Sequence, residues 1–302
     1  MGYQLSPGIN VSEVDLTTVV PSVLTTAGAY VGAFKWGPAN QVVLVDSEIT
    51  LSKTFGTPDS NTATSFFSAA NFLAYGNNLS VVRAVGSTAL NSSSKAGGAT
   101  RIQNSSEFAD TLLSTDNGNV FGAFISRYPG ALGNSLTVSV VDTGNSTYSD
   151  LFSTVPGTSD YVSNVGGAND EIHIVVTDRG GLFTGVANTV LETYPFVSKA
   201  SDAINLNSGS SNYYKQVVFN SSRYIYAVDP ADYANTSTSW GKTASNRSFN
   251  SISTGAINYP LSSGVDAMPT NSDINSGWSI FANKEKYDIS SLITGAANTA
   301  VQ

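Results

Sequence analysis

Cysteine is absent from this sequence and histidine occurs only once, so two side chains that carry much of protein chemistry are missing or nearly so. Without cysteine the chain can form no disulfide, no thiolate nucleophile and no cysteine-ligated zinc site. The single histidine, His173, lies in a stretch where apolar residues alternate, with no partner motif beside it. Such a histidine is more often a hydrogen-bonded structural side chain than a catalyst, so we predict no catalytic role for it.

Charged residues are also scarce, at 12% of the 302 residues, and they give a net charge of −8 and a pI of about 4.5. The sequence contains no basic stripe, so we expect no nucleic-acid partner. The N-terminus has neither the charged nor the apolar region of a signal peptide, and no run approaches the roughly 18 apolar residues of a membrane span. We therefore expect no membrane insertion.

Serine, threonine, asparagine and glycine replace the missing charge, a composition that suits β-structure, loops and packing against other subunits. Residues 1–22 are predicted to form an extended N-terminal arm, because prolines stand near both ends and its apolar residues are too sparse for a core element. An arm of this kind either lies on its own domain or adds a strand to a neighbour. The residues alone leave both possibilities open.

A compact α/β pattern follows the arm. Asp46 or Ser47 is the expected N-cap of its first helix, and Gly56 and Gly76 are the expected stops of its two helices. Strands and helices in this order indicate one half of a layered α/β unit. The predicted strands are 27–34, a buried strand at 41–45 and a strand buried on both faces at 79–85, and the predicted helices are 48–55 and 62–75.

The segment KWGPAN lies between the first two predicted strands, and we interpret it as a bend rather than a ligand site. Gly37 tolerates a positive φ, and Pro38 presets the φ of a turn and cannot donate to a strand ladder. The alternative is that Lys35 and Trp36 contact a phosphate or a ring. We predict that Trp36, Gly37 and Pro38 form a core turn that lets two core strands meet.

Residues 88–100 are rich in Ser, Ala and Gly and are predicted to be a linker. After a helix at 105–114, which Ser105 or Ser106 is expected to cap, the remainder to residue 277 is β-rich. The segment TDRGGLFTG predicts a hairpin turn. The predicted strands are 120–128, 135–142, 171–178 with period-two alternation, 215–220 and 223–229, and a last strand of buried type at 287–294 precedes the start of a helix.

The remaining polar clusters favour structural roles. TDNGN and DTGNSTYSD collect oxygen ligands that could hold calcium, but neither has EF-hand spacing, and turns use the same residues. Glu171, Asp178 and Glu192 would form a glycosidase pair only if folding brought two of them within roughly 5 to 9 Å, which their spacing does not require. No nucleotide-binding loop or nucleophile elbow occurs. We predict no enzyme, no catalytic residue, no metal and no cofactor.

Tyrosines are frequent in the β-rich part, and their rings could stack on sugars or bases, although packing in a core or an interface is the preferred interpretation. Their abundance motivates one alternative function from another class, a carbohydrate-binding or surface-array β-protein. The tyrosines in question are Tyr213, Tyr214, Tyr224 and Tyr226.

Several blocks of this sequence resemble the tail sheath proteins of contractile-tailed phages, and the T-even-like sheaths most of all. SPGINVSEVD followed by GAFKWGPANQVVLVDSEITLSKTFG is similar to the family's arm, Gly-Pro turn and helix ending in Phe-Gly. FLAYGNNLSVVRAV looks like its helix leading into a Val-Arg strand. SRYPGALGNSLTVSV is similar to the block that opens the family's β-rich domain, and it contains Tyr128, Pro129, Gly130, Gly133 and Asn134. VLETYPFVSKASDA and KYDISSLITGAANTAVQ extend the resemblance.

The resemblance implies a structural subunit of a virion, assembled in the host cytoplasm, that forms a homo-oligomer of six-fold rings stacked helically around the tail tube protein. It also implies contacts with baseplate and tail terminator proteins, and contraction that drives the tube through the host envelope. In this family the N-terminal arm donates a strand to a neighbouring subunit. The residues that would make that intersubunit arm are Ile9, Val11, Val14, Val19 and Val20.

For the fold, the resemblance implies a mixed α+β and α/β protein. Residues 23–87 and 278–302 would form one discontinuous layered α/β core, and residues 101–277 an inserted β-rich, sandwich-like domain. The sequence departs from the family in two respects. A protruding domain between the Val-Arg strand and the Tyr-Pro-Gly block is missing, and sheaths of this kind continue beyond YDISSLITG. We therefore expect that this chain lacks the C-terminal part of such a subunit.

Overall fold

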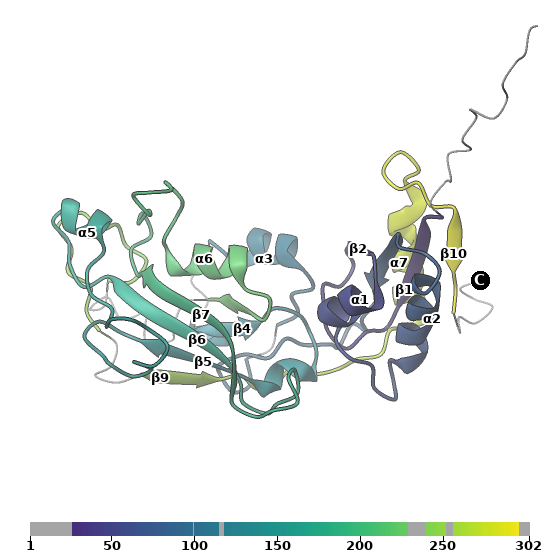
Figure 1. Ribbon diagram of the computed structural model, residues 1–302, viewed down its shortest axis with the longest axis horizontal. Coiled ribbons are helices and arrows are strands. Elements are labelled where there is room, and N and C mark those ends of the chain that lie inside the picture. Colours follow the sequence, from purple (N-terminus) through teal and green to yellow (C-terminus); the bar gives the residue numbers. More distant parts are fainter. Residues whose placement is uncertain (1–25, 99, 115–117, 229–238, 252–255, 296–302) are drawn as a thin grey trace, which may run out of the picture.

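The fold is mixed α/β with several sheets. Figure 1 shows two lobes joined by passages of extended chain. The lobe drawn at the right, which we call the α/β lobe, contains both the first and the last described strands, and the other lobe, which we call the β-rich lobe, contains the larger sheet. The computed structural model describes residues 26–98, 100–114, 118–228, 239–251 and 256–295.

The α/β lobe is built on a four-stranded sheet whose strands are β1 (Gly28–Gly32), β2 (Val42–Val45), β3 (Leu79–Arg83) and β10 (Ser291–Ile293). Their order across the sheet is β10-β1-β3-β2. β1 pairs in parallel with both β10 and β3, whereas β2 pairs antiparallel with β3. The sheet therefore joins the beginning of the described chain to its end.

Helices cover both faces of this sheet because successive side chains of a strand point to opposite sides. Tyr30 and Val81 pack in one hydrophobic cluster with residues of α1 and α2. Their neighbours Val31 and Val82 pack in another, with residues of α7 and of the short helix η4 that follows it. The helices are α1 (Glu48–Phe55), α2 (Ala63–Leu73), α7 (Asn271–Ser279) and η4 (Ile280–Ala282).

The ends of α1 agree with the prediction from the sequence. The Ser47 hydroxyl accepts a hydrogen bond from the amide of Thr50, which satisfies one of the free donors at the start of the helix. Gly56 follows the last turn with φ of +79°, and its amide donates to the carbonyl of Ser52. The helix therefore begins and ends where the N-cap and the glycine place it.

The β-rich lobe is built on an antiparallel sheet in the order β7-β6-β5-β9. A hydrophobic cluster that includes Leu136, Ile174 and Trp240 contains side chains from these strands and from α6. The strands are β5 (Leu136–Val141), β6 (Glu171–Asp178), β7 (Thr189–Ser198) and β9 (Ile257–Pro260).

Smaller elements complete this lobe, among them a two-stranded antiparallel sheet of β4 and β8. These smaller elements are α3 (Ser105–Thr111), α4 (Gly118–Phe121), β4 (Phe124–Ser126), η2 (Ala131–Ser135), α5 (Asp160–Asn164), α6 (Tyr214–Ser221) and β8 (Ile225–Ala227).

No helix within the described residues is long and apolar enough to span a bilayer.

Two strands predicted to be buried are edge strands instead. In β2 only Val45 is fully buried, and Leu44 is 64% exposed. In β10 the middle residue, Leu292, is 63% exposed. Apolar runs of four to eight residues fit either a central or an edge position, so the prediction of burial was wrong for both strands.

The prediction of a strand at 215–220 was also wrong, because these residues lie in α6. Tyr214 and Val218, one helical turn apart, are buried on the inner side of that helix. The β-prone run of valine and phenylalanine indicated a strand, but packing decides between the two structures for so short a segment. Similarly, the predicted strand at 120–128 is shortened to β4, and the N-cap of α3 is Asn104 rather than a serine.

The alternation in β6 does not produce an exposed face. His173 and Val175, the residues between the three buried apolar positions, are themselves 1% and 0% exposed. The His173 ring stacks on Phe152, its Nδ1 accepts a hydrogen bond from the amide of Phe196, and its Nε2 lies 3.0 Å from the carbonyl oxygen of Thr154. His173 is thus a hydrogen-bonded core side chain, as its isolation in the sequence suggested.

Residues 88–100 connect the lobes without being an exposed tether. Asn91 and Ser93 are fully buried. The Asn91 side-chain amide donates to the carbonyl of Ser126, and the Ser93 amide donates to the carbonyl of Ser262. Polar side chains of this segment therefore hydrogen-bond the β-rich lobe, which their Ser- and Gly-rich composition did not predict.

The predicted hairpin turn between β6 and β7 is present, and Asp178 organises it. The buried carboxylate accepts hydrogen bonds from the amides of Leu182, Phe183 and Thr184 at 2.9 to 3.1 Å, and from the hydroxyl of Ser135. Burial alone would raise the pKa of Asp178, but these hydrogen bonds outweigh it and hold the pKa below its ordinary value. The ionised carboxylate thus fixes the loop that connects the two longest strands.

We predict that Asp178→Asn lowers the free energy of unfolding by about 2 kcal/mol, because the amide cannot accept all of these hydrogen bonds. The folded-state pKa of Asp178 is depressed, so its contribution is complete above the unfolded value near 3.9 and is lost as the pH falls through the folded value. Urea unfolding at several pH values should therefore show the difference shrinking below about pH 4. The exposed Asp150→Asn is the control, and equal effects of the two changes would contradict this role.

Candidate functional site at the joint between the lobes

The predicted core turn lies on the boundary between the two lobes. The Trp36 ring is 5% exposed and makes edge-to-face contacts with Tyr128 at 5.3 Å and Phe183 at 5.0 Å, both in the β-rich lobe. The two strands that flank the turn do not meet, because β3 lies between β1 and β2. The prediction that this turn lets two core strands meet was therefore wrong. The chain crosses over β3 between β1 and β2, and Trp36 packs against the other lobe.

Gly37 allows the turn to pack tightly against the end of α1. Its φ is +96°, a conformation that side chains with a Cβ rarely adopt. A Cβ at this position would lie 2.7 Å from the backbone oxygen of Thr54 and 2.7 Å from the ring of Phe55. Lys35, which was considered as a phosphate contact, has its Nζ 4.0 Å from the Asp59 carboxylate.

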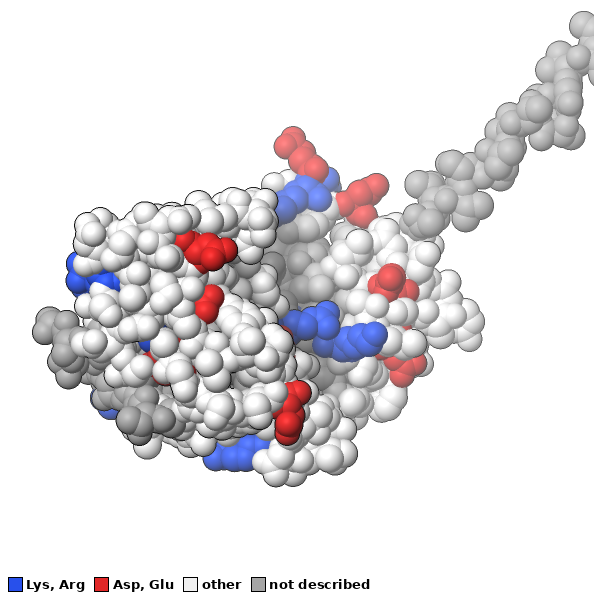
Figure 2. Space-filling view, turned by 60° about the vertical axis from the view of Figure 1, so that its left-hand side comes forward, with Lys and Arg blue, Asp and Glu red and all other residues white. Residues whose placement is uncertain are grey.

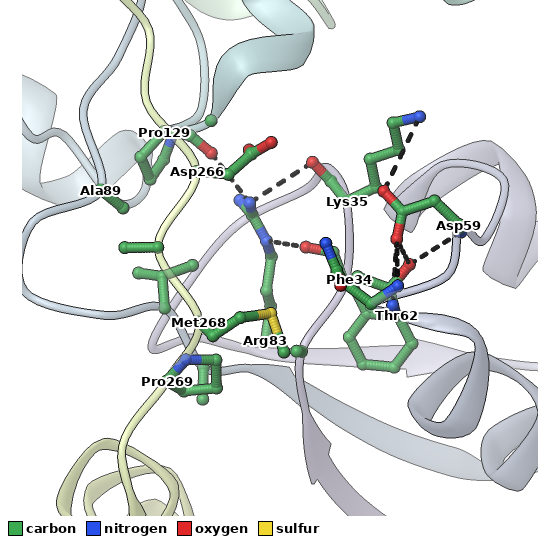
Figure 3. Close-up of a pocket in the computed structure, with 16 residues that line it drawn as sticks. Phe34, Lys35, Asp59, Thr62, Arg83, Ala89, Pro129, Asp266, Met268 and Pro269 are labelled. Atoms are coloured by element: carbon green, nitrogen blue, oxygen red, sulfur yellow. Dashed lines mark hydrogen bonds and ion pairs between the residues drawn. The ribbon is translucent and has the colours of Figure 1, made fainter.

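Arg83, the last residue of β3, holds the turn and the β-rich lobe together (Figure 3). Arg83 is 3% exposed, and its guanidinium donates to three carbonyl oxygens at 2.8 Å and to a fourth, that of Lys35, at 3.4 Å. Nε donates to Phe34, Nη1 to Gly37, and Nη2 to Pro129 across the boundary. The planar guanidinium fixes these directions, so one side chain joins the turn to the other lobe.

The positive charge of Arg83 is offset by a nearby carboxylate, that of Asp266. Burial lowers the pKa of Arg83 to about 10, while the nearby Asp266 carboxylate and Tyr128 act in the opposite direction. The guanidinium therefore remains protonated at neutral pH. Asp266 in turn accepts a hydrogen bond from the amide of Ala131 at 2.8 Å, so the counter-charge is also anchored in the β-rich lobe.

The Tyr-Pro-Gly and Gly-Asn residues lie on the other side of this joint. Gly130 has φ of +138°, and a Cβ there would lie 2.8 Å from the Asp266 carboxylate. Gly133 packs against the side chain of Ser126. Asn134 accepts a hydrogen bond from the amide of Gly264 and donates to its carbonyl. The motif thus fixes the segment that returns to the α/β lobe.

The structure brings the predicted turn and the predicted motif together through Arg83 and Asp266, which were not predicted to be site residues. The available signal was an arginine inside an apolar run, because a buried cation must find partners. The arm residues Ile9, Val11, Val14, Val19 and Val20 lie outside the described residues, as do the last residues, for which a helix was predicted. Part of TDNGN also lies outside them.

A small pocket of about 160 Å³ borders the joint, with Arg83, Asp266 and Met268 among its lining residues (Figure 3). Its buried cation, Arg83, already donates to backbone carbonyls, and Lys35, which also lines the pocket, lies 4.0 Å from the Asp59 carboxylate. In the described part of the chain no three His, Asp or Glu side chains are grouped as metal ligands would be. In DTGNSTYSD, Asp142 forms a buried ion pair with Lys199 instead.

The three carboxylates weighed as a glycosidase pair are engaged in structural hydrogen bonds. Glu171 and Asp178 stand at opposite ends of β6, and a strand of that length separates them by roughly 23 Å. Glu192 accepts hydrogen bonds from the Tyr194 and Ser222 hydroxyls and from the amide of Arg223. The pKa of Asp178 is lowered, which is the opposite of what a general acid requires.

We predict that Arg83→Lys lowers the free energy of unfolding by about 2 to 4 kcal/mol, because the donors of an ammonium all radiate from one nitrogen and cannot reach carbonyls that the guanidinium meets from three separate nitrogens. Chemical denaturation and limited proteolysis between the lobes are the measurements. Arg179→Lys is the matched control, since Arg179 is exposed and donates to Asn134 at 3.0 Å. If both variants were equally stable, the fork would not hold the joint.

We predict that Gly37→Ala costs about 3 kcal/mol, of which about 1 to 2 kcal/mol is backbone strain and the rest is contact with the Thr54 carbonyl. Gly97 separates the two effects, because its φ is +77° and nothing lies within 4 Å of a Cβ there. Gly97→Ala should therefore show the strain alone. Thermal unfolding of both variants tests this, and equal losses would mean that close packing at Gly37 is unimportant.

Comparison with known proteins adds an independent observation. Residues 25–84 match the family model described as the tail sheath protein Gp18 domain III N-terminal region. The chain is 50% identical over 94 residues to the tail sheath protein of Enterobacteria phage T4, which is 31% of this chain and 14% of that protein. It is 32% identical over 191 residues to the tail sheath protein of Salmonella phage ViI, which is 62% of this chain and 28% of that protein.

Among solved structures, a sheath tail protein from Listeria innocua aligns with a TM-score of 0.47 and 14% identity, over 92% of this chain and 42% of that one. The matched segments thus span less than a third of the two curated phage proteins and less than half of the solved structure. Residues 25–84 contain the core turn and Arg83, so the joint lies partly in the matched family region. By these matches, the chain is similar to proteins named tail sheath protein from the phages T4 and ViI.

Proposed function

We propose that this chain is part of a structural, non-enzymatic subunit of a phage contractile tail sheath, located in the virion tail. The observation that carries the proposal is the similarity to proteins named tail sheath protein, which reaches 50% identity over 94 residues. The subunit polymerises with copies of itself into six-fold rings stacked helically around the tail tube. It meets baseplate and tail terminator proteins at the ends of the sheath and requires no cofactor.

The subunit has a discontinuous core in this proposal. From the sequence, residues 23–87 and 278–302 form the layered α/β core, and residues 101–277 form a β-rich domain inserted into it. Because α7 (Asn271–Ser279) packs on the α/β sheet, we place the return to the core at the start of α7 rather than at residue 278. The parallel pairing of β10 with β1 supports the discontinuity, since it joins residues 28 and 291 in one sheet. The antiparallel bridge between Leu90 and Val265 supports the insertion, because it holds the two passages between the lobes side by side.

Contraction, in this proposal, occurs between subunits rather than within this part of the chain. The buried fork of Arg83 and the aromatic contacts of Trp36 favour movement of the two lobes as one body. Residues 1–22 add a strand to a neighbouring subunit, and main-chain hydrogen bonds of that kind tolerate rotation of the bodies they connect. The switch is then a repacking of bistable interfaces, summed over the array.

The alternative of a carbohydrate-binding protein receives no support from the tyrosines that motivated it. Tyr214 and Tyr226 are 1% and 0% exposed, so their rings cannot stack on a sugar. Tyr213 and Tyr224 are partly buried against the cluster of the β-rich lobe. Core packing, the preferred interpretation from the sequence, accounts for Tyr214 and Tyr226.

Immunogold electron microscopy of virions tests the proposal, with antibodies raised against this chain. We expect label along the whole outer surface of extended tails, and label confined to the shortened sheath, with bare tube beyond it, in contracted tails. Tails without any sheath, prepared from a mutant phage, are the control and should remain unlabelled. Label on capsids, fibres or baseplates alone would refute the proposal.

A further inference from the structure

A cleft of about 730 Å³ opens between the lobes, on the side where α1 faces the β-rich lobe. Figure 2 shows the hollow and the blue Lys and Arg side chains gathered in it. Trp36 and Val43 line it from the α/β lobe, and Tyr128, Phe183 and Tyr224 line it from the β-rich lobe. Because the joint at Arg83 fixes the lobes, the cleft is preformed rather than created by their movement.

The charge of the cleft is opposite in sign to that of the whole chain. Lys53, Arg127 and Arg223 line it, and none of its described lining residues is Asp or Glu. Lys53 and Arg223 are exposed. Arg127 is half-buried, donates to the carbonyl of Phe219 and lies 4.7 Å from the centre of the Tyr226 ring. Three of only 14 Lys and Arg residues thus meet in one place, on a chain with a net charge of −8.

The floor of the cleft is aromatic. Phe183 packs edge-to-face against Trp36, with ring centroids 5.0 Å apart, and against Tyr224, at 5.1 Å. Tyr128 packs edge-to-face against Trp36 at 5.3 Å. Tyr128, Phe183 and Tyr224 are only partly buried, so part of each ring faces the cleft. An apolar floor between cations fits a peptide segment that combines carboxylates with apolar side chains.

We propose that this cleft docks an acidic segment of a second copy of this chain. The inference rests on the proposed function, because a helical polymer needs a head-to-tail contact between two different surfaces of one subunit. Charge complementarity favours a second copy as the partner. Each copy carries 22 acidic residues and 14 basic ones, whereas the charged residues that line the cleft are all basic. Such a contact steers association and suppresses wrong registers more than it adds affinity.

Charge reversal in the cleft is the first experiment. We expect Lys53→Glu combined with Arg223→Glu to raise the critical concentration for polymerisation of the full chain by about tenfold or more, measured by sedimentation and electron microscopy. Lys242→Glu combined with Lys284→Glu is the matched control, because both lysines are exposed outside the cleft and the change in net charge is the same. Equal critical concentrations for the two double variants would overturn the inference.

Zero-length amine-to-carboxylate crosslinking of the unmodified chain is the second experiment, and it does not depend on the folding of a variant. Polymers are grown from an equal mixture of ¹⁴N- and ¹⁵N-labelled chains, and crosslinked peptides that contain Lys53 are identified by mass spectrometry. Pairs that combine the two isotopes support docking of a second copy. Same-isotope pairs alone, or no Lys53 crosslink, would overturn it, because the cleft would then be filled from its own chain or empty.

The two proposals can fail separately. If the unmodified chain forms sheath-like polymers but the cleft variant behaves as its control, only the docking inference is wrong. If the unmodified chain forms no polymer under conditions in which sheaths assemble, the proposed function is wrong, and the docking of a second copy is wrong with it.

Discussion

The hydrogen-bonded guanidinium of Arg83 is the constraint on which the arrangement of the lobes depends. A cation that is 3% exposed has lost most of its hydration, so carbonyl groups must replace the water. Two of those carbonyls lie around the turn after β1 and a third lies in the Tyr-Pro-Gly segment. The fork satisfies all three only when the lobes have one relative orientation, and this directional demand specifies geometry more than it adds stability.

The other features of the joint follow from this orientation. Trp36 can reach Tyr128 and Phe183 because the turn is held against the β-rich lobe, and Gly37 is needed because the same turn also touches the end of α1. The cleft beside the joint keeps its shape for the same reason. The Asn91 side chain and the backbone of residues 88–100 add a second set of hydrogen bonds, so the passage between the lobes is also tied to the β-rich lobe.

Local features of the sequence could be predicted where one side chain decides the structure. Ser47 and Gly56 set the ends of α1, and the mostly apolar run of β3 indicated burial on both faces. Features that depend on distant partners could not be predicted in the same way. The run at 215–220 is β-prone but forms α6, because the inner side of that helix packs on the hydrophobic cluster of the β-rich lobe. Arg83 is a site residue only because it donates to carbonyl groups of residues 46 to 49 positions away in the sequence. Edge and central strands look alike in sequence, as β2 illustrates.

The pairing of β10 with β1 also determines when the α/β lobe can be completed. The two strands are 263 residues apart, and a ribosome adding about 5 to 20 residues per second presents β10 roughly 15 to 50 s after β1. During that interval β1 has β3 on one side and an open backbone edge on the other, which is a template for pairing with other chains. The β-rich lobe, which lies between them in sequence, is synthesised before this edge can close. During this interval the open edge of β1 is one place where the newly made subunit can pair with another chain.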